Sequence, residues 1–556
     1  MLLNGSEILI QCLIEQGVDT IFGYPGGAVL NIYDALYKYR DDIRHVLTCH
    51  EQGASHAADG YARSTGKVGV CLATSGPGAT NLVTGIATAY MDSIPMVAIT
   101  GNVTRPLLGK DSFQEVDITG ITLPITKHNF MVRDINELAD IIREAFRIAQ
   151  EGRPGPVLVD IPKDISAQKG AYIKQEPVKV KRKTEFITDK ALDEVAKLIN
   201  QSSKPFIYAG GGIIRADASE ELMEFAEKID SPTATSLMCM GGFPVTHPLF
   251  TGMIGMHGTK ASNLGAWECD LLIAIGSRFS DRVISSNSNL EGAKIIHLDI
   301  DPAEINKNVK VDASVIGDVR ETLRKLIPLV EKKNNNEWTE KIKGYKDSVK
   351  NLNSKKEELT PEFLFEKIND LTNGEAIITT EVGQHQMWAS QFYKHMKPKR
   401  FVTSGGLGTM GFGLGAAIGS KVGNPDKLVI NIAGDGSFAM NCNELATAYA
   451  QKAPVITIIV NNNALGMVRQ WQNFFYEERY SHTSINRGTN FVKLVEAYGG
   501  KGYLVEKREE LEPVLKEAIN SSVPVVIDYR VHEDKKVFPM VAPGALINQI
   551  IYEEDV

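Results

Sequence analysis

The sequence is poor in cysteine and has no long apolar run. Its 556 residues include six cysteines, and none of them stands in a Cys-x-x-Cys pair. In so long a chain, scattered thiols argue against a disulfide framework or a metal-cysteine cluster and favour a reducing, cytoplasmic location. Apolar runs such as "PVITIIV" at 454–460 are far shorter than the ~20 residues that a membrane span needs, so no membrane partner is expected.

A strong excess of one charge is also lacking. The formal net charge is -8, and charged residues make up 23% of the chain, so no basic surface for a nucleic acid is predicted. Hydrophobic residues reach 43%, which is enough for buried cores. The length is too great for one core and suggests roughly three domains of about 150–200 residues.

Short β-branched runs alternate with longer amphipathic segments, as in "VGVCLAT", "VLVDIP", "LLIAIG" and "LVINIA". This alternation predicts an α/β fold of doubly wound parallel sheets. Two lysine-rich stretches, 174–186 and 331–359, break it and are expected to be surface connections, the second partly helical. We therefore expect three domains, at 1–170, 187–335 and 360–556.

The first and third domains contain a degenerate repeat. "KVGVCLATSGPGATNLVTGIATAY" at 67–90 and "KLVINIAGDGSFAMNCNELATAY" at 427–449 share a lysine, a strand, a glycine turn and the closing "ATAY". Each is followed by a Pro-led strand with an Asn seven residues after the Pro, Asn102 and Asn461. Duplication or convergence within doubly wound folds explains the repeat, and both predict a shared topology for the two domains.

The turn in "NIAGDGSFAM" at 431–440 has the glycines of a phosphate-binding turn, but it also contains an acidic side chain. Gly434 and Gly436 follow a predicted strand and precede the expected helix "NCNELATAYA", so backbone amides could approach a phosphate, but Asp435 would repel it unless a cation stood between them. Asn462 follows the next predicted strand, and Asp435, Asn462 and a backbone carbonyl near Ala464 would be oxygen ligands of the kind that Mg²⁺ prefers. A structural turn with a capping Asp is the alternative.

No P-loop lysine follows this turn, and the spacing of Gly-Asp-Gly to Asn-Asn resembles the diphosphate motif of thiamine-diphosphate enzymes. Thiamine chemistry also needs a carboxylate at the pyrimidine ring, on another domain. In "LTCHEQGASHAADGYAR" at 47–63, Glu51 follows a predicted strand and begins a helix. A helix N-terminal charge is the alternative role; paired with the turn on a matching domain, Glu51 becomes the catalytic candidate.

Further motifs extend this likeness to nearly the whole chain: "GYPGGA" at 23–28, "TSGPGATN" at 74–81, "DSFQEVD" at 111–117, "GSRFSDR" at 276–282, "TSGGLGTMGFGLGAAIG" at 403–419 and "LGMVRQWQ" at 465–472. With them the sequence resembles the thiamine-diphosphate-dependent acetohydroxyacid (acetolactate) synthases, catalytic subunit. The resemblance implies a pyrimidine-binding, a central FAD-binding-like and a diphosphate-binding domain, with thiamine diphosphate, Mg²⁺ and FAD as cofactors.

The resemblance also implies roles for individual residues. For thiamine diphosphate it implies Glu51, Gln384, His385, Met410, Gly434, Gly436 and Met467, with Met410 as an apolar wedge that keeps the cofactor bent. It places Gly27, Gln114 and Lys163 in the active-site funnel. For FAD it implies Arg153, Gly211, Met256, His257, Gly276, Arg278, Asp299 and Asp318, and for the substrates Phe113, Arg282, Val468 and Trp471. Ser280, where the family often has an acid, departs from the pattern.

The implied reaction is the decarboxylation of pyruvate and transfer of the two-carbon unit to pyruvate or 2-ketobutyrate, which gives 2-acetolactate or 2-aceto-2-hydroxybutyrate. This is the first common step of valine, leucine and isoleucine biosynthesis. A homodimer or tetramer with active sites shared between subunits, and a small regulatory subunit, are the implied partners. A catabolic acetolactate synthase, a pyruvate oxidase, a simple 2-keto acid decarboxylase and a non-catalytic flavin-binding or scaffold protein are the alternatives.

The C-terminal stretch 538–550 is expected either to cover the site or to pack on the surface.

Overall fold

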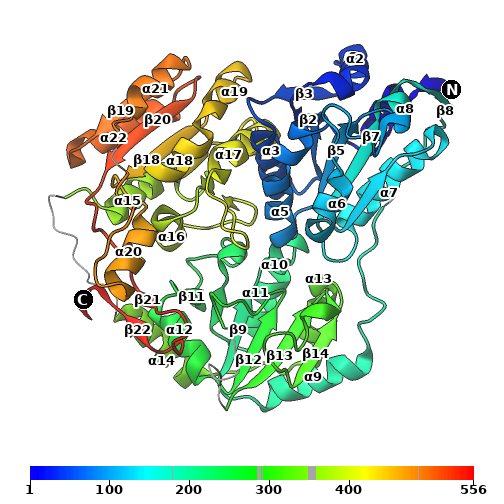
Figure 1. Cartoon of the computed structure of the whole chain (residues 1–556). Helices are drawn as coiled ribbons and strands as arrows, with labels where there is room; N and C mark the ends of the chain where they lie inside the picture. Colours follow the sequence, from blue (N-terminus) through cyan, green and yellow to red (C-terminus); the bar gives the residue numbers. More distant parts are fainter. Residues whose placement is uncertain (178, 285–289, 291, 349–357, 486, 556) are drawn as a thin grey trace.

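The computed structural model describes residues 1–556 except 178, 285–289, 291, 349–357, 486 and 556. The described chain forms three α/β domains arranged as a triangle, with the N-terminal domain in blue, the middle domain in green and the C-terminal domain in yellow and orange (Figure 1). Each domain contains a six-stranded sheet. All neighbouring strands that pair within these three sheets are parallel, which confirms the predicted fold class.

The N-terminal sheet has the strand order β3-β2-β4-β5-β7-β6. Its strands are β2 (Thr20–Gly23), β3 (Arg44–Leu47), β4 (Gly69–Ala73), β5 (Met96–Asn102), β6 (His128–Met131) and β7 (Pro156–Pro162). The helices around it are α1 (Gly5–Glu15), α2 (Leu30–Lys38), α3 (Glu51–Thr65), α4 (Pro77–Asn81), α5 (Val83–Met91), α6 (Ile118–Thr122), α7 (Leu138–Gln150) and α8 (Lys163–Ala167). A short antiparallel pair, β1 (Leu2–Asn4) with β8 (Lys169–Ala171), ties the chain start to the end of the domain.

The C-terminal sheet has the strand order β16-β15-β17-β18-β20-β19. Its strands are β15 (Ile377–Thr380), β16 (Phe401–Val402), β17 (Val429–Gly434), β18 (Ile456–Asn461), β19 (Lys501–Val505) and β20 (Val525–Arg530). Its helices are α15 (Pro361–Thr372), α16 (Gln384–Phe392), α17 (Phe412–Gly423), α18 (Asp435–Asn441), α19 (Leu445–Ala450), α20 (Gly466–Phe475), α21 (Phe491–Ala497) and α22 (Arg508–Ile519). In both outer domains the spatial order is the second, first, third, fourth, sixth and fifth strand of the domain, so the predicted shared topology is confirmed.

The two outer domains also share a buried polar pair. Asn102 at the end of β5 donates through Nδ2 to Asp160 Oδ2 on β7 at 2.6 Å, and Asn461 at the end of β18 donates to Asp528 Oδ1 on β20 at 2.8 Å. Each Asp lies opposite the residue two positions before the Asn. A doubly wound topology does not require this pair, so its recurrence favours duplication over convergence as the origin of the repeat.

The middle sheet has a different order, β11-β10-β9-β12-β13-β14. Its strands are β9 (Pro205–Ala209), β10 (Thr233–Thr235), β11 (Phe250–Met253), β12 (Leu271–Ile275), β13 (Lys294–Asp299) and β14 (Ala313–Ile316), and its helices are α9 (Asp189–Gln201), α10 (Gly212–Arg215), α11 (Ser219–Lys228), α12 (Lys260–Glu268), α13 (Val319–Leu326) and α14 (Asn336–Asp347). In chain order the strands run third, second, first, fourth, fifth, sixth, which is the order of dinucleotide-binding sheets. The strand order reverses between the paired strands β9 and β12, so a crevice is expected at their carboxyl ends.

Two peripheral segments pack on the middle domain. Helix α14 lies in the polar stretch 331–359, which is partly helical as predicted, and its buried Trp338 donates from Nε1 to the Pro205 carbonyl at 2.9 Å. The C-terminal tail crosses over from the C-terminal domain: Val541 N–H donates to the Met256 carbonyl at 2.7 Å, and Ile547 is buried in the middle domain's core. Strands β21 (Met540–Val541) and β22 (Ile550–Ile551) pair within this tail.

Helix α3 joins the N-terminal domain to the C-terminal one. The helix starts after His50, whose Nδ1 accepts the Gln52 N–H at 3.1 Å, and ends at Gly66 in the left-handed conformation. Its small residues allow α17 to approach at backbone distance, since a Cβ on Gly60 would lie 2.2 Å from the Ala416 carbonyl oxygen. None of the helices in the described part of the chain combines the length and apolar character that a membrane span requires.

The substitution Gly60→Ala should therefore push α3 and α17 apart. We expect a loss of about 1–3 kcal/mol, the usual cost of overpacking a dense interior, seen as a lower midpoint in calorimetric unfolding. The matched control is Gly344→Ala in α14, where an added Cβ meets no atom within 4 Å. That control should leave the midpoint unchanged or raise it slightly, because alanine favours helix over glycine. Equal midpoints for the two variants would contradict the proposed close packing.

Candidate active site

The carboxyl edge of the N-terminal sheet carries Glu51 as the first residue of α3. Its side chain is buried, with the residue 8% exposed, and Asn81 Nδ2 donates to Glu51 Oε2 at 2.9 Å. Gly78 approaches the other oxygen, because a Cβ there would lie 3.1 Å from Oε1. Glu51 is thus a fixed carboxylate at the edge where parallel sheets bind ligands.

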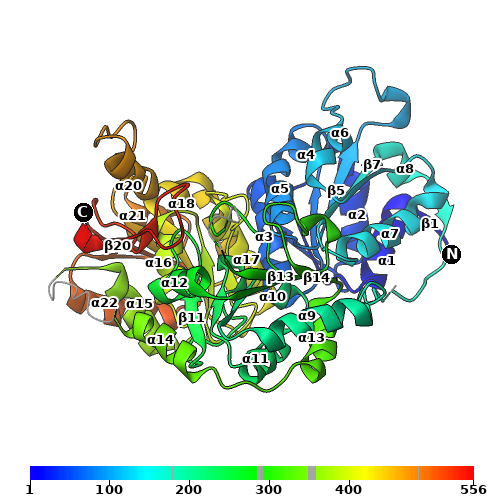
Figure 2. The same ribbon diagram turned by 90° about the horizontal axis from the view of Figure 1, so that it is seen from below.

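The other N-terminal candidates lie at the same edge but are more open. Gln114 has a left-handed backbone, with φ of 58°. It packs on the turn at Gly76, since a Cβ added to Gly76 would lie 2.9 Å from the Cα of Gln114. Gly27 is exposed, and Lys163 begins α8 directly after β7. Phe113 is 88% exposed, in a segment before α6 that extends away from the domain (Figure 2).

The carboxyl edge of the C-terminal sheet brings Asp435 and Asn462 to the ends of two neighbouring strands, β17 and β18. The helix after the glycine turn begins at Asp435 itself, earlier than the sequence predicts. Asp435 is 5% exposed, and within the described chain its Oδ1 has no hydrogen-bond partner. Asn462 Oδ1 accepts the Ala464 N–H at 3.2 Å, while Asn462 Nδ2 donates to Gln384 Oε1 at 3.3 Å.

His385 of α16 lies beside the glycine turn. A Cβ on Gly434 would lie 2.8 Å from His385 Nδ1, so only glycine allows the ring so near the turn. Burial lowers the pKa of His385 to about 3, which keeps the ring neutral, and among the described residues its Nε2 has no partner. A neutral ring and glycines leave room for an anion's oxygens beside the Asp435 carboxylate.

The oxygens at this edge fit a hard cation. Burial raises the pKa of Asp435 to about 7, because the carboxylate lies in a dry environment without a cationic partner in contact. Asp435 supplies a carboxylate, Asn462 an amide oxygen and Ala464 a carbonyl, the ligand types of Mg²⁺. No cluster of three or more His, Cys, Asp or Glu side chains suited to a metal occurs among the described residues, so the remaining ligands would come from water or a phosphate.

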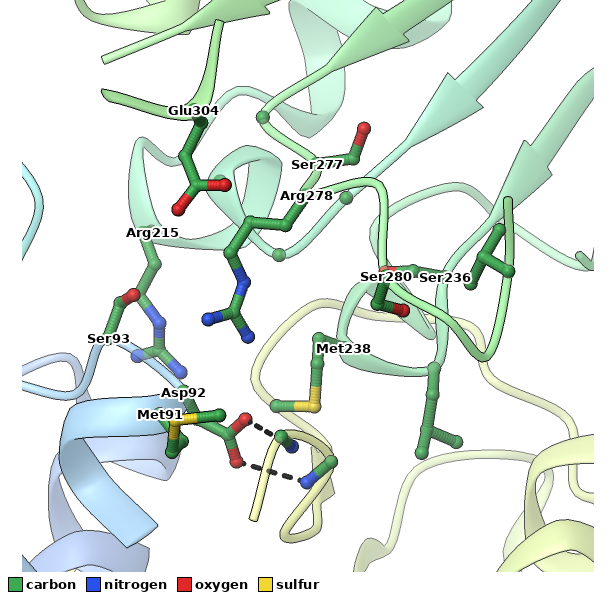
Figure 3. A pocket seen from close by; sticks show the side chains of 18 of the residues that line it. Met91, Asp92, Ser93, Arg215, Ser236, Met238, Ser277, Arg278, Ser280 and Glu304 are labelled. Atoms are coloured by element: carbon green, nitrogen blue, oxygen red, sulfur yellow. Dashed lines mark hydrogen bonds between the residues drawn. The ribbon is translucent and has the colours of Figure 1, made fainter. Parts of the chain in front are cut away.

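A cavity of about 1230 Å³ lies where the three domains meet. It lies at the carboxyl ends of β9 and β12. It is bordered by the N-terminal residues Met91, Asp92 and Ser93 and by the middle-domain residues Arg215, Met238, Arg278 and Glu304 (Figure 3). All the residues predicted to contact FAD line it: Arg153, Gly211, Met256, His257, Gly276, Arg278, Asp299 and Asp318. Ser280, the departure from the family pattern, lines it too.

Substrate candidates from two domains reach the same cavity. Arg282 of the middle domain and Trp471 of α20 both line it, and the Arg282 guanidinium lies 5.5 Å from the Trp471 ring centroid. Met467 also lines the cavity, whereas Val468 is 51% exposed and does not. The structure therefore unites Arg282, Met467 and Trp471 and leaves Val468 on the outer face of the helix.

Glu444, in the turn after α18, connects the two outer domains, because it accepts the N–H groups of Cys49 and His50 at 3.2 and 3.0 Å. Within the described residues, however, no hydrogen bond or ion pair joins Glu51 to Asp435 or Asn462. The activating and the metal-binding candidates thus form separate groups in one chain.

Comparison with known proteins gives the family. The thiamine pyrophosphate enzyme N-terminal TPP binding domain matches residues 3–121, the central domain 192–326 and the C-terminal TPP binding domain 381–529. The acetolactate synthase large subunits of Porphyra purpurea and Corynebacterium glutamicum are each 48% identical to this chain, over 99% of it and over 95% and 90% of their own lengths. A probable acetolactate synthase large subunit of Methanocaldococcus jannaschii is 47% identical over 99% of this chain and 95% of its own.

The chain belongs to the acetolactate synthase large subunits. The family predicted from the sequence motifs is confirmed, and the first and third domains are its thiamine pyrophosphate-binding domains. The buried carboxylates Glu51 and Asp435 lie at the carboxyl edges of these two thiamine pyrophosphate-binding domains, one in each.

One buried acid of this large subunit was missed by the sequence reasoning. Glu381, directly after β15, accepts the Gly411 N–H at 2.7 Å and the Leu414 N–H at 3.2 Å, next to Met410. Asn441 Nδ2 holds the Gly411 carbonyl at 2.7 Å from the other side. An acid immediately after an apolar strand, in "AIITTE", is the signal that also marks Asp435, and it could have identified Glu381.

Glu381 should make stability depend on pH. Burial raises the pKa of its carboxyl from the ordinary 4.5 to about 7, although the bonds from backbone N–H groups oppose the rise. Between these values the unfolded chain has lost the proton that the folded chain keeps, so the stability that Glu381 contributes is present below 4.5 and is lost as the pH rises through 7. Because glutamine does not titrate, Glu381→Gln removes this pH-dependent loss of stability.

In unfolding experiments, the stability of E381Q relative to the wild type should therefore increase as the pH is raised from about 4.5 to 7 and then level off. The control is Glu375→Gln, at a carboxyl whose pKa is lowered by the hydrogen bond from Lys397; it should show no such increase. A constant difference between E381Q and the wild type over this range would contradict a raised pKa.

Proposed function

We propose that this protein is an acetolactate synthase that decarboxylates pyruvate and joins the two-carbon unit to pyruvate or 2-ketobutyrate, forming 2-acetolactate or 2-aceto-2-hydroxybutyrate for branched-chain amino acid biosynthesis. The observation that carries the proposal is the buried, unpartnered Asp435 oxygen beside Asn462, on the edge of a thiamine pyrophosphate-binding domain. Glu51 on the matching edge of the N-terminal domain supplies the second group that this chemistry needs.

In this proposal Asp435, Asn462 and the Ala464 carbonyl hold Mg²⁺, while Gln384, His385, Gly434 and Gly436 surround the diphosphate of thiamine diphosphate. When bound, thiamine diphosphate supplies the electron sink for decarboxylation. Because Asn81 holds Glu51 Oε2, Oε1 remains to exchange a proton with the pyrimidine nitrogen. Met410, fixed through Gly411, serves as the apolar wedge under the cofactor.

We propose that FAD occupies the cavity between the domains and takes no part in electron transfer, since decarboxylation followed by carbon–carbon bond formation has no net redox change. The strand order of the middle sheet and the lining by all the predicted flavin residues support this proposal. Arg153, which pairs with Glu304 at 2.8 Å and lines the cavity, would be a cationic contact for the FAD diphosphate. A pyruvate oxidase would instead pass electrons to FAD.

The part of the cavity lined by Arg282 and Trp471 supports the proposal that a 2-keto acid is the acceptor substrate. Arg282 can hold a carboxylate by a bidentate, charge-assisted pair, and Trp471 forms an apolar wall beside it. Such a wall favours the ethyl group of 2-ketobutyrate over the methyl group of pyruvate.

The exposed positions of Gly27 and Phe113 and the half-buried position of Gln114 support active sites shared between subunits, with Lys163 in the same funnel. We propose a homodimer or a tetramer in which the C-terminal edge of one subunit meets the N-terminal edge of the other. The words "large subunit" in the relatives' names support a small regulatory partner. All six cysteines are unpaired, which supports a reducing cytoplasm as the location.

A competition assay tests the proposal. The protein is incubated with pyruvate and 2-ketobutyrate, with and without thiamine diphosphate, Mg²⁺ and FAD, and the products and the oxygen uptake are measured. Both acetohydroxyacids should form, each cofactor should be required, and no oxygen should be consumed. Oxygen uptake with pyruvate would indicate the oxidase, free aldehyde a simple decarboxylase, and the absence of any condensation product would refute the assignment.

Glu51→Gln and Asp435→Ala should fail in different ways. E51Q keeps a partner for Asn81 but cannot exchange the proton, so kcat should fall by about 10²–10⁴ while calorimetry finds cofactor binding nearly unchanged. D435A should weaken thiamine diphosphate binding and be partly rescued by excess Mg²⁺ and cofactor. If E51Q lost the cofactor and D435A kept it, the roles assigned to the two sheet edges would be wrong.

Trp471→Leu should reduce the preference for 2-ketobutyrate over pyruvate by roughly tenfold, since one methylene in an apolar pocket contributes about 1–3 kcal/mol. The control is Phe475→Leu on the same helix, because Phe475 packs on Trp471 with ring centroids 5.8 Å apart but does not line the cavity. The ratio of the two products at equal substrate concentrations measures the effect. An unchanged ratio in W471L would remove Trp471 from the acceptor site.

A further inference from the structure

The segment 403–409 of the C-terminal domain forms part of the cavity wall. Ser404, Gly405, Gly406, Leu407 and Gly408 line the cavity, and Met410 follows directly. The middle domain reaches this wall as well, since a Cβ on Gly405 would lie 2.3 Å from Met238 Sδ. The wall of the proposed flavin site and the proposed wedge under thiamine are therefore one short stretch of backbone.

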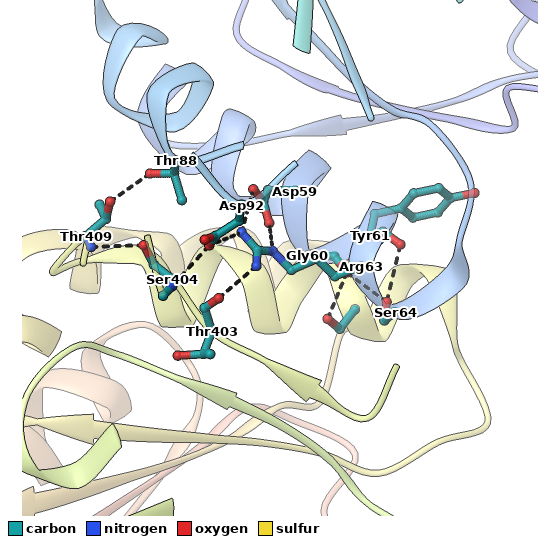
Figure 4. Close-up of polar contacts among 12 residues, drawn as sticks. Asp59, Gly60, Tyr61, Arg63, Ser64, Thr88, Asp92, Thr403, Ser404 and Thr409 are labelled. Carbon is teal, nitrogen blue, oxygen red and sulfur yellow. Dashed lines mark hydrogen bonds and ion pairs between the residues drawn. The ribbon is translucent and has the colours of Figure 1, made fainter. Parts of the chain in front are cut away.

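The N-terminal domain of the same chain holds this stretch through a buried carboxylate. Asp92, at the end of α5, accepts the Gly405 N–H at 3.0 Å and the Gly406 N–H at 2.7 Å (Figure 3). Arg63 of α3 donates to Asp92 at 2.9 Å and to the Thr403 carbonyl at 2.8 Å (Figure 4). Hydrogen bonds that backbone N–H groups donate to a carboxylate are among the stronger ones in proteins, so Asp92 fixes the wall.

Further contacts fix the stretch beyond the wall. The Thr88 and Thr409 hydroxyls lie 2.7 Å apart (Figure 4), and Gly411 is held by Glu381 and Asn441 at 2.7 Å each. Asn441 ends α18, the helix that begins at Asp435. About five residues of backbone therefore connect the wall to Met410, and Gly411, which follows, is connected through Asn441 to the helix that carries the proposed metal ligand.

We propose that Asp92 is a positioning residue that couples occupancy of the cavity to thiamine diphosphate binding. A ligand such as FAD in the cavity would contact residues 404–408, which Asp92 holds from the other domain, and would thereby restrict Met410, the residue that would serve as the wedge for thiamine diphosphate. This inference rests on the proposed function, because it requires both cofactors. It gives a flavin without a redox role a physical task, and thermodynamic linkage requires that each cofactor strengthen the binding of the other by the same factor.

Asp92→Asn tests the coupling. The variant replaces one of the two oxygens by an N–H donor, so one glycine N–H loses its acceptor. The matched control is Asp59→Asn, a second buried carboxylate on Arg63, bonded to Arg63 Nη2 at 3.2 Å but not to the wall. Each variant removes a negatively charged partner of Arg63, so both should lower the unfolding midpoint. Only D92N loosens the wall directly.

Affinity for thiamine diphosphate with Mg²⁺ is measured by calorimetry on the full chain, in the presence and absence of FAD. FAD binding itself is followed by flavin fluorescence. In the wild type and D59N, FAD should tighten thiamine diphosphate binding by about tenfold. In D92N the enhancement should fall below about twofold, although FAD still binds.

Equal enhancement in D92N and D59N, or none in a wild type that binds FAD, would overturn the coupling while leaving the proposed function intact. A wild type that binds no FAD would overturn the flavin assignment and, with it, the coupling. If D92N does not fold, Thr88→Val serves instead: it removes the hydroxyl contact with Thr409 without touching a charge. T88V should lower the enhancement two- to fivefold, and an unchanged enhancement would overturn the proposal.

Discussion

The close packing of α3 against α17 is the contact on which the rest of the structure depends. Glu51 begins α3, and Met410 immediately precedes the cap of α17, so the backbone approach of Gly60 to Ala416 relates the two carboxyl edges of the outer sheets. Arg63, buried between Asp59 and Asp92, adds a charged anchor to this apolar contact (Figure 4). Removing a single partner from such a network is costly, because it leaves a charge buried without compensation.

The middle domain depends on the same contact in a different way. It encloses a cavity only because the outer domains complete the wall, with Asp92 and Ser93 from one and segment 404–408 from the other (Figure 3). A ligand in this cavity touches all three domains at once. Binding free energy gained in this cavity can therefore help to orient groups of all three domains.

Much of the fold could be predicted from local patterns, because parallel strands need apolar runs and their connections need helices. The repeat predicted the shared topology of the outer domains, and the recurring Asn102–Asp160 and Asn461–Asp528 pairs now support duplication. The helix that begins at Asp435 was predicted too late, because glycine in the turn suppresses the helical signal that burial and packing restore. Glu381 does follow a predicted strand, but its burial depends on the Gly411 and Leu414 N–H groups at the start of α17, and these backbone partners cannot be read from side-chain types.

By itself the sequence determined the fold class, the order of the domains, the family and the residue types at each sheet edge, since these follow from periodicity and from motifs of adjacent residues. Only the tertiary structure decided which residues from different domains meet: Arg282 with Trp471, Asp92 with the Gly405 and Gly406 N–H groups, and all the flavin candidates around one cavity. The physical reason is that such contacts depend on how helices of small residues let whole domains approach. That distance is set by packing across hundreds of residues of chain, which no local pattern encodes.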